Sequence, residues 1–335
     1  MSPLLRLEQS NCQLQIAMLT QYLLVPGLFE PPDSEISAHF PNLDMLLSRS
    51  DHVVEKKDNF ESLLCSHFDV GPPPNQDLPS ASLMLSGEGG EPQTDSWAVA
   101  APVRLHVDRD RLLLFPLSNE EFEKSDVDRL REAFNQHFRD DGVELITDFP
   151  RHWYLRLQQP RELTTSSLAQ VAGRTLDPFL PGGADAAWLR GLMNESQMLL
   201  HSQDIPALNS LWIWGVGQLP EAVHCHFGEL SGDNPLLLGL QANTVSGCRG
   251  EACLMVKDAS LQAVQSGDQQ QWLQAMEDLD ATIEELLKAL SNGKIRKIIL
   301  QDGSGNSFHY RSFMRLRLWR SHFNAEQSAG RGVTN

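Results

Sequence analysis

The residues best suited to binding a small anion lie in one short segment, Asn209–Gly217, which reads Asn-Ser-Leu-Trp-Ile-Trp-Gly-Val-Gly. Backbone amides of Gly215 and Gly217, beside the guanidinium of Arg174, could bind a phosphate or a carboxylate. The structural alternative is a tight, closely packed turn at the glycines, with the two tryptophans packed in the core on alternate sides of a strand. The sequence thus gives a set of candidate ligand-binding residues and no catalytic one: Arg174, Asn209, Trp212, Trp214, Gly215 and Gly217.

Phosphoryl-transfer chemistry would instead require a metal site. Two divalent metals, Mn²⁺ or Mg²⁺, could serve it only if scattered acidic and imidazole side chains converged in space. The candidates for such convergence are Asp44, Asp51, His52, His224, His226, Asp302 and His309. A zinc site at Cys225, Cys248 and Cys253 lacks a Cys-x-x-Cys pair, the usual spacing of structural zinc. Each residue reads more simply as an ordinary side chain, so the expectation is no cofactor.

Residues 97–160 have the pattern of a small α+β lobe. Alternating apolar residues predict a strand through Val103 and Val107, followed by a hairpin. A capping-box spacing at Ser118–Glu121 predicts a helix start, and two strand-like runs follow at Val143–Thr147 and Trp153–Leu157.

Residues 161–320 predict a C-terminal α/β core. Its expected strands are Asn209–Gly217, Ala252–Val256, Ile295–Leu300 and Ser307–Arg311, with a helix at about Ala184–His201. The helix at Asp268–Leu290 carries a near-heptad apolar stripe. It could lie on its own sheet, or it could form the partner surface of a plain structural subunit.

The remaining segments are less regular. Residues 1–70 predict two or three short helices of the core lobe, with an apolar patch at Leu23–Val25 in the first part. Residues 71–96 are rich in turn formers and predict a flexible connection. Residues 321–335 are expected to be a disordered tail.

Charge excludes several classes of partner. The formal net charge is −17, with 44 acidic against 27 basic residues. Such a chain would repel nucleic acid and anionic membranes. Because the sequence shows no signal peptide or long apolar span and its five cysteines are scattered, we expect a cytoplasmic protein.

One basic stretch departs from this acidity. Its residues are Arg311, Arg315, Arg317, Arg320 and Arg331. They read either as a charged final element with a frayed tail, or as a docking patch for an acidic partner or a phosphate.

From Trp97 onward, the order of elements and motifs resembles the archaeal-type cofactor-independent phosphoglycerate mutases of the alkaline phosphatase superfamily. The segments that carry the resemblance are Leu163–Arg174, Leu180–Gly183 and Asn209–Gly217, followed by Gly267-Asp268 and its helix. The whole layout also resembles a narrower bacterial group named for the regulatory protein RpfE. The resemblance implies an alkaline-phosphatase-like α/β core with an α+β substrate-type lobe.

The metal ligands of that enzyme family have no counterparts at the matching positions. The chain start has no Asp-Gly, the expected late Asp-His is replaced by Ile298–Gly303, and the family's Pro-His is Ser166-Ser167. The resemblance therefore implies a degenerate scaffold, and a non-catalytic regulatory or interaction protein with an unknown protein partner. A small phosphorylated or carboxylate metabolite is a further expected ligand. The alternative is a mutase or phosphatase with non-standard metal ligands.

Overall fold

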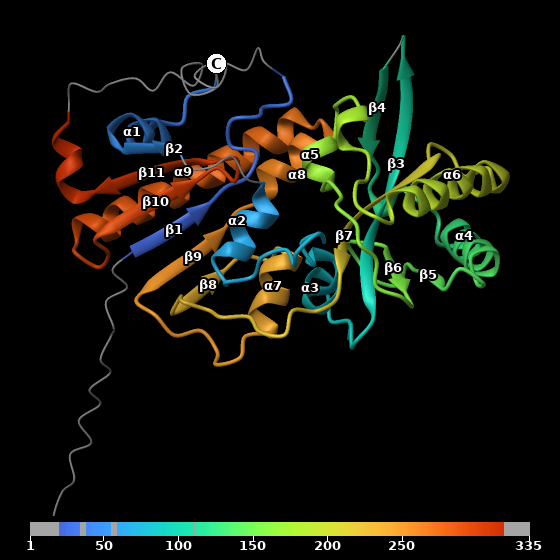
Figure 1. Cartoon of the computed structure of the whole chain (residues 1–335). Helices are drawn as coiled ribbons and strands as arrows, with labels where there is room; N and C mark the ends of the chain where they lie inside the picture. Colours follow the sequence, from blue (N-terminus) through green and yellow to red (C-terminus); the bar gives the residue numbers. More distant parts are fainter. Residues whose placement is uncertain (1–19, 34–37, 55–58, 110, 318–335) are drawn as a thin grey trace, which may run out of the picture.

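The protein folds into two β-sheets, each covered by helices, in a computed structural model that describes residues 20–33, 38–54, 59–109 and 111–317 (Figure 1). The chain builds part of the first sheet, passes to the second, and returns to complete the first. The fold is mixed α/β, which confirms the class expected from the sequence.

The first sheet, called here the core sheet, has the strand order β2-β11-β10-β1-β9-β8. Strands β10, β1, β9 and β8 are parallel, while β11 is antiparallel to β10 and to β2. The strands are β1 (Thr20–Leu24), β2 (Asp51–Val54), β8 (Glu229–Ser231), β9 (Ala252–Val256), β10 (Lys297–Gln301) and β11 (Asn306–Arg311).

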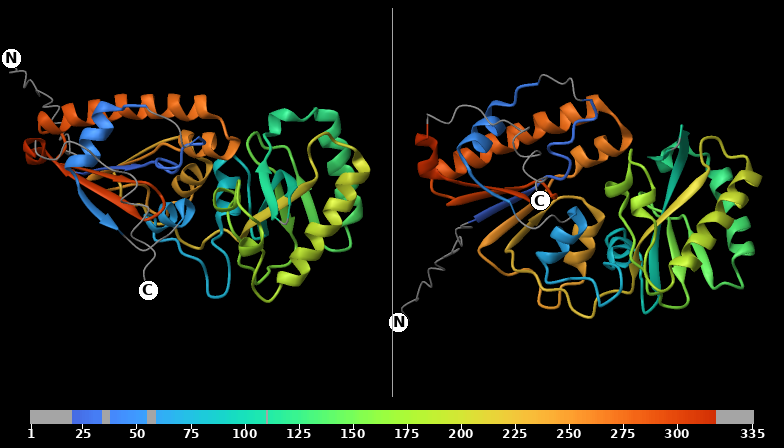
Figure 2. Two further views of the ribbon diagram at one scale, coloured as in Figure 1. Left: turned by 90° about the horizontal axis from the view of Figure 1, so that it is seen from above. Right: turned by 45° about the horizontal axis from the view of Figure 1, so that its top comes forward.

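Helices cover both faces of the core sheet (Figure 2). Because side chains alternate along a strand, Leu23 and Val25 pack with one helical layer and Leu24 with the other. One layer contains α1 (Pro41–Arg49), α8 (Ala259–Ser266) and α9 (Gln269–Ser291). The opposite layer contains α2 (Phe60–Ser66), α3 (Ser80–Gly87) and α7 (Pro235–Ala242).

The helix predicted at Asp268–Leu290 is confirmed as α9. Asp268 caps it by accepting the amide hydrogens of Gln270 and Gln271 at 2.9 and 3.0 Å. Its buried stripe consists of Trp272, Met276, Leu279, Ile283 and Leu290, all packed on the core sheet. Each such side chain stabilises the fold by about 1.5–3 kcal/mol. The stripe is therefore used internally, which removes the sequence support for α9 as a partner surface.

The second sheet, called here the lobe sheet, is built around the long strand β3 (Ser96–Asp108). It also contains β4 (Arg111–Pro116), β5 (Val143–Ile146), β6 (Tyr154–Leu157) and β7 (Ser210–Gly217), in the order β4-β3-β6-β5 with β7 also on β3. Its helices are α4 (Lys124–His137), α5 (Leu168–Val171) and α6 (Ala186–Gln203). Short 3₁₀ turns are η1 (Asn119–Glu121), η2 (Asp177–Phe179) and η3 (Ser312–Leu316).

Three sequence expectations differ from the structure. Residues 71–96 contain the buried helix α3, not only a flexible connection. Within residues 1–70, Leu23 and Leu24 belong to the central strand β1, not to a helix. The expected division at residue 160 is not seen, because β7 pairs with β3 and joins residues 161–217 to the lobe sheet.

Helices α3 and α7 join the two sheets by direct contact. A Cβ on Gly239 would lie 1.8 Å from the carbonyl oxygen of Leu83, and one on Gly87 would lie 1.9 Å from that of Pro235. The two backbones thus touch where larger residues could not fit. One continuous apolar cluster runs from Leu24 through these helices to the lobe sheet.

Two further sequence expectations concern the chain ends and membranes. The tail at residues 321–335 lies outside the described residues. None of the described helices is long and apolar enough to cross a bilayer.

Candidate functional site

The parallel strands of the core sheet end at one edge, which is where open α/β sheets bind ligands. Strand β1 runs into Pro26-Gly27, β9 into Lys257-Asp258, and β10 into Asp302. Strand β8 leads into Gly232-Asp233. This edge therefore places one ammonium and three carboxylates near each other without a histidine in these turns.

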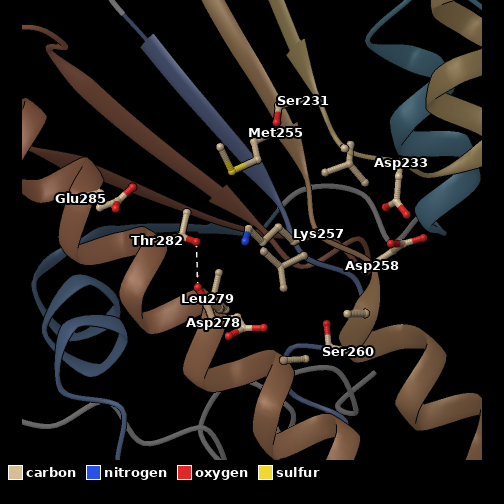
Figure 3. Close-up of a pocket in the computed structure, with 15 residues that line it drawn as sticks. Ser231, Asp233, Met255, Lys257, Asp258, Ser260, Asp278, Leu279, Thr282 and Glu285 are labelled. Atoms are coloured by element: carbon tan, nitrogen blue, oxygen red, sulfur yellow. Dashed lines mark hydrogen bonds between the residues drawn. The ribbon is translucent and has the colours of Figure 1, made fainter.

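A pocket of about 380 Å³ opens at this edge (Figure 3). The turns after β8 and β9 form one wall, and α9 forms the other. Polar side chains on its walls are Ser231, Asp233, Lys257, Asp258, Ser260, Asp278, Thr282 and Glu285. The pocket can hold a small polar molecule rather than an extended chain.

Two of the pocket carboxylates already have strong donors within the protein. Arg151 donates to Asp233 Oδ2 at 2.6 Å and to its carbonyl at 2.9 Å, a hydrogen bond that raises the pKa of Arg151 and lowers that of Asp233. Buried Asp258 accepts from Asn234 Nδ2 at 2.6 Å. Asp233 is therefore paired with a cation, and Asp258 accepts a hydrogen bond from a neutral amide, without a ligand.

Lys257 differs from these neighbours. Its side chain reaches into the pocket between α9 and the strand ends (Figure 3). Within the described part of the chain, no carboxylate pairs with its ammonium within 4.0 Å. The pocket consequently contains an ammonium without a direct ion pair, among the hydroxyls of Ser260 and Thr282 and the carboxylates of the same walls.

The residues at this edge do not fit a two-metal site. Asp302 Oδ1 accepts the amide hydrogens of Ser304 and Asn306, both at 2.9 Å. Its Oδ2 accepts from Ser304 Oγ and Asn306 Nδ2, both at 2.6 Å. Among the described residues, no group of three or more His, Cys, Asp or Glu side chains is placed to hold an ion.

Four of the candidate metal ligands lie near one another: Asp51 and His309 are in register on β2 and β11, and the Asn306 side chain contacts both His52 and Asp302. Their printed contacts nevertheless go to protein groups. Asp44 pairs with His39 at 2.6 Å, and Asp51 pairs with Arg317 at 2.7 Å. His52 contacts Asn306, His226 pairs with Asp69, and His309 contacts Ser307. Of the three cysteines considered for zinc, Cys225 and Cys248 lie within hydrogen-bond reach of each other, whereas Cys253 donates to Glu229.

Two of the predicted ligand-binding residues, Asn209 just before β7 and Arg174 after α5, contact other parts of the protein. The Asn209 side chain pairs with both backbone groups of Leu105, at 2.7 and 2.9 Å. Arg174 lies 3.9 Å from Glu30 and is half exposed. Asn209 and Arg174 thus have partners within the protein, and ligand binding by the predicted residues stays a prediction.

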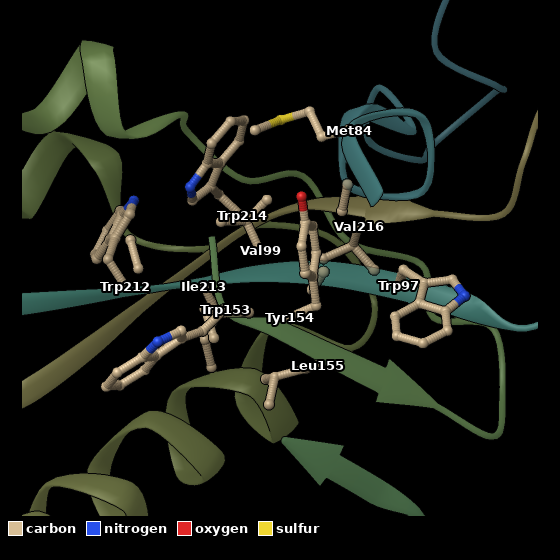
Figure 4. Packing of buried hydrophobic residues seen from close by; sticks show 14 of the residues in the cluster. Met84, Trp97, Val99, Trp153, Tyr154, Leu155, Trp212, Ile213, Trp214 and Val216 are labelled. Carbon is tan, nitrogen blue, oxygen red and sulfur yellow. The ribbon is translucent and has the colours of Figure 1, made fainter. Parts of the chain in front are cut away.

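Trp212 and Trp214 lie on the same side of β7, not on alternate sides, because residues two apart in a strand point the same way (Figure 4). Trp212 donates from Nε1 to the carbonyl of Ser166 at 2.9 Å. The buried Nε1 of Trp214 has no hydrogen-bond partner among the residues that the structure describes. Both rings pack in the core, and Trp214 lies beside Met84 of α3.

Gly215 and Gly217 allow close packing against the start of α3. Gly215 has φ of +69°, and a Cβ there would lie 2.4 Å from Ser80 Oγ. A Cβ on Gly217 would lie 2.7 Å from Pro79 Cβ. The Gly215 amide donates to Thr165 Oγ1 at 2.9 Å, so it is not directed at a ligand.

Asp77 is a part-buried residue that the sequence did not single out. It accepts hydrogen bonds from the Thr165 hydroxyl and from the Val216 amide, which lies at 3.3 Å. Burial raises the pKa of Asp77 to about 6, although the hydrogen bonds from Thr165, Val216 and Leu78 lower it. The Asp77 carboxyl thus connects the loop before α3 to Thr165, 88 residues later in the sequence, and to Val216 of the lobe sheet, 139 residues later.

Glu88 forms a second buried contact between α3 and the lobe sheet. It accepts from His152 Nδ1 and, at 2.9 Å, from the Tyr154 hydroxyl. Burial opposes the charged form of Glu88, but these hydrogen bonds and the charge of His152 hold its pKa below the ordinary value. The site is fully occupied by protein groups, which favours a structural role.

Comparison with known proteins gives structural neighbours only. No family model matches the chain, and no curated protein matches it. Among solved structures, it is similar to a cofactor-independent phosphoglycerate mutase from Thermoplasma acidophilum DSM 1728, with 15% identity and a TM-score of 0.43 over 94% of this chain and 95% of that chain.

A second similar structure is the PH0037 protein from Pyrococcus horikoshii. It shares 13% identity with a TM-score of 0.47, over 88% of this chain and 87% of that chain. At these identities and scores, neither similarity carries an argument about activity.

Proposed function

We propose that the protein is a non-catalytic regulatory or interaction protein on a degenerate phosphoglycerate-mutase-like scaffold, and that its edge pocket binds a small carboxylate or phosphate ester. The observation that carries this proposal is the contrast at the strand ends. The Asp302 oxygens are occupied by protein donors, whereas the Lys257 ammonium faces the pocket without an ion pair. Such an arrangement suits an anionic ligand better than a pair of cations.

The chemistry of the pocket narrows the ligand class. Lys257 would bind the anionic group, and the carboxylates of Asp278 and Glu285 on α9 would accept from hydroxyl or amino groups on the same molecule. A purely anionic ligand without donors would be repelled by that wall. We therefore propose a small hydroxylated or aminated acid, for which 3-phosphoglycerate is a convenient probe.

Calorimetric titration of the chelator-treated protein tests this function. We expect 3-phosphoglycerate to bind and Mn²⁺ and Mg²⁺ not to bind tightly. Lys257→Met should weaken the binding by at least about tenfold, since a hydrogen bond to a charged group contributes about 1.5–3 kcal/mol. Lys124→Met, which removes an exposed lysine on α4, should leave it unchanged.

Two results would contradict the proposal in different ways. Tight binding of two metal ions, with phosphatase or mutase activity that chelator abolishes, would revive the metal-dependent enzyme. Equal affinity of the Lys257→Met variant and the wild type would show that the pocket is not the ligand site.

A further inference from the structure

The end of the core sheet opposite the pocket carries an unusual concentration of basic residues. Residues 291–317 contain six Lys or Arg and a single acid, Asp302, in a chain whose net charge is −17. Asp302 lies at the far end of β10 and is buried. The basic residues of this segment are Lys294, Arg296, Lys297, Arg311, Arg315 and Arg317.

Strand register holds two of these cations side by side. Lys297 at the start of β10 pairs directly with Arg311 at the end of β11. Like charges placed opposite each other in an antiparallel pair destabilise the sheet. Burial and the neighbouring Arg311 guanidinium lower the pKa of Lys297, which is the expected sign of an uncompensated cation pair.

Among the described residues, no carboxylate forms an ion pair with Lys297 or Arg311. Arg317 pairs with Asp51 at 2.7 Å, and the Arg49 side chain donates to the carbonyl of Arg315. Within the described residues, by contrast, Lys297, Arg311 and Arg315 have no ion pair. The described part of the fold thus holds three cations without an acidic side chain paired to any of them.

Apolar side chains are exposed beside these cations. Turn η3 follows β11 directly and buries Met314, while Phe313 is 55% and Leu316 is 65% exposed. The turn lies at the red end of the described chain, away from the lobe sheet (Figure 1). Aromatic residues and arginine are both enriched in protein interfaces, relative to the rest of a protein surface.

We propose that Lys297, Arg311, Arg315, Phe313 and Leu316 form a docking surface for an acidic protein segment that also carries apolar side chains. The cations attract its carboxylates, and Phe313 and Leu316 contact its apolar groups. Nucleic acid and anionic membranes fit less well, because an extended polyanion would also meet the acidic remainder of the molecule. This surface is separate from the pocket, so it would exist even if the proposed small-ligand function proved wrong.

Fluorescence anisotropy can test this with a labelled peptide of alternating Glu and Leu or Phe residues. We expect binding to the full chain that weakens strongly between about 50 mM and about 300 mM salt, where charges are screened. A peptide with Gln in place of Glu should not bind.

The protein variants locate the surface. The double substitution Arg311→Glu, Arg315→Glu should weaken peptide binding by at least about tenfold, since close charge pairs across interfaces couple strongly. The double variant should still fold, because Glu at position 311 would place a carboxylate opposite Lys297 and remove the repulsion between two cations. Arg139→Glu with Arg249→Glu makes the same change of net charge elsewhere and should bind as the wild type does. Phe313→Ser should weaken binding severalfold without altering its salt dependence.

Three outcomes would overturn the proposal. They are no binding of the acidic peptide, equal loss of affinity in both double variants, and tighter binding of a short DNA duplex or of phosphatidylserine vesicles than of the peptide.

Discussion

The ionisation of Asp77 opposes the folded state. Its folded pKa of about 6 lies above the ordinary carboxyl value of 3.8, chiefly because the group is buried. A raised folded pKa gives stability that is fully present below the unfolded pKa and is lost as pH rises through about 6. The loss amounts to about 3 kcal/mol, from about 1.36 kcal/mol for each pKa unit.

Asp77→Asn should remove this loss. Urea unfolding at about pH 4.5 and about pH 7.5 gives the free energy of unfolding of both proteins. Relative to wild type, the variant should be more stable by roughly 2 kcal/mol at the higher pH than at the lower pH. Asp140→Asn, at an exposed position, should show no such shift. A pH-independent difference for Asp77→Asn would mean that Asp77 stays charged in the fold.

At the same scale, the sequence could locate some features of the site but not their partners. Asn209–Gly217 was correctly recognised as a buried strand entering a glycine turn. Two of its backbone amides, however, donate hydrogen bonds to Thr165 and Asp77, which lie far away in the sequence. The pocket around Lys257 also joins turns and a helix that only the folded sheet brings together. Local spacing carries no signal for such contacts.

At the scale of elements, glycine has opposite effects in two helices. In α7, a Cβ at Gly239 would collide with the backbone of Leu83. In α6, a Cβ at Gly191 would meet nothing within 4 Å. Substitution by alanine at Gly239 therefore tests the contact between α7 and α3, and the same substitution at Gly191 tests helix propensity alone.

Gly239→Ala should lower the free energy of unfolding by about 3 kcal/mol or more, because the α3–α7 contact must separate. Gly191→Ala should raise it by roughly 0.5–1 kcal/mol, because alanine favours the helix. Denaturant unfolding of both variants measures this contrast. A mild effect at Gly239 would show that the two helices are less tightly apposed.

The elements that the sequence predicted well are those with one clear apolar face. Helix α9 has a long stripe and a capping residue, Asp268. Strand β1 was mistaken for a helix because a central strand covered on both faces lacks the alternation of a half-buried one. Helix α3 was missed because it is short, buried on most sides and set among Pro and Gly residues.

At the scale of the whole molecule, the shared apolar cluster and the Asp77 and Glu88 contacts bind the two sheets together. We therefore expect one cooperative thermal transition, with equal calorimetric and van't Hoff enthalpies. Differential scanning calorimetry at neutral pH measures it. Two separate transitions would show that the lobe sheet and the core sheet unfold independently.

The position of β1 has a consequence for biosynthesis. Its two neighbours in the sheet, β9 and β10, are encoded far downstream, so the strand leaves the ribosome long before either can pair with it. At typical elongation rates, the roughly 230 intervening residues take on the order of 10–50 s to translate. During that time an apolar strand with open edges is exposed, which makes the nascent chain a substrate for chaperones that shield such segments.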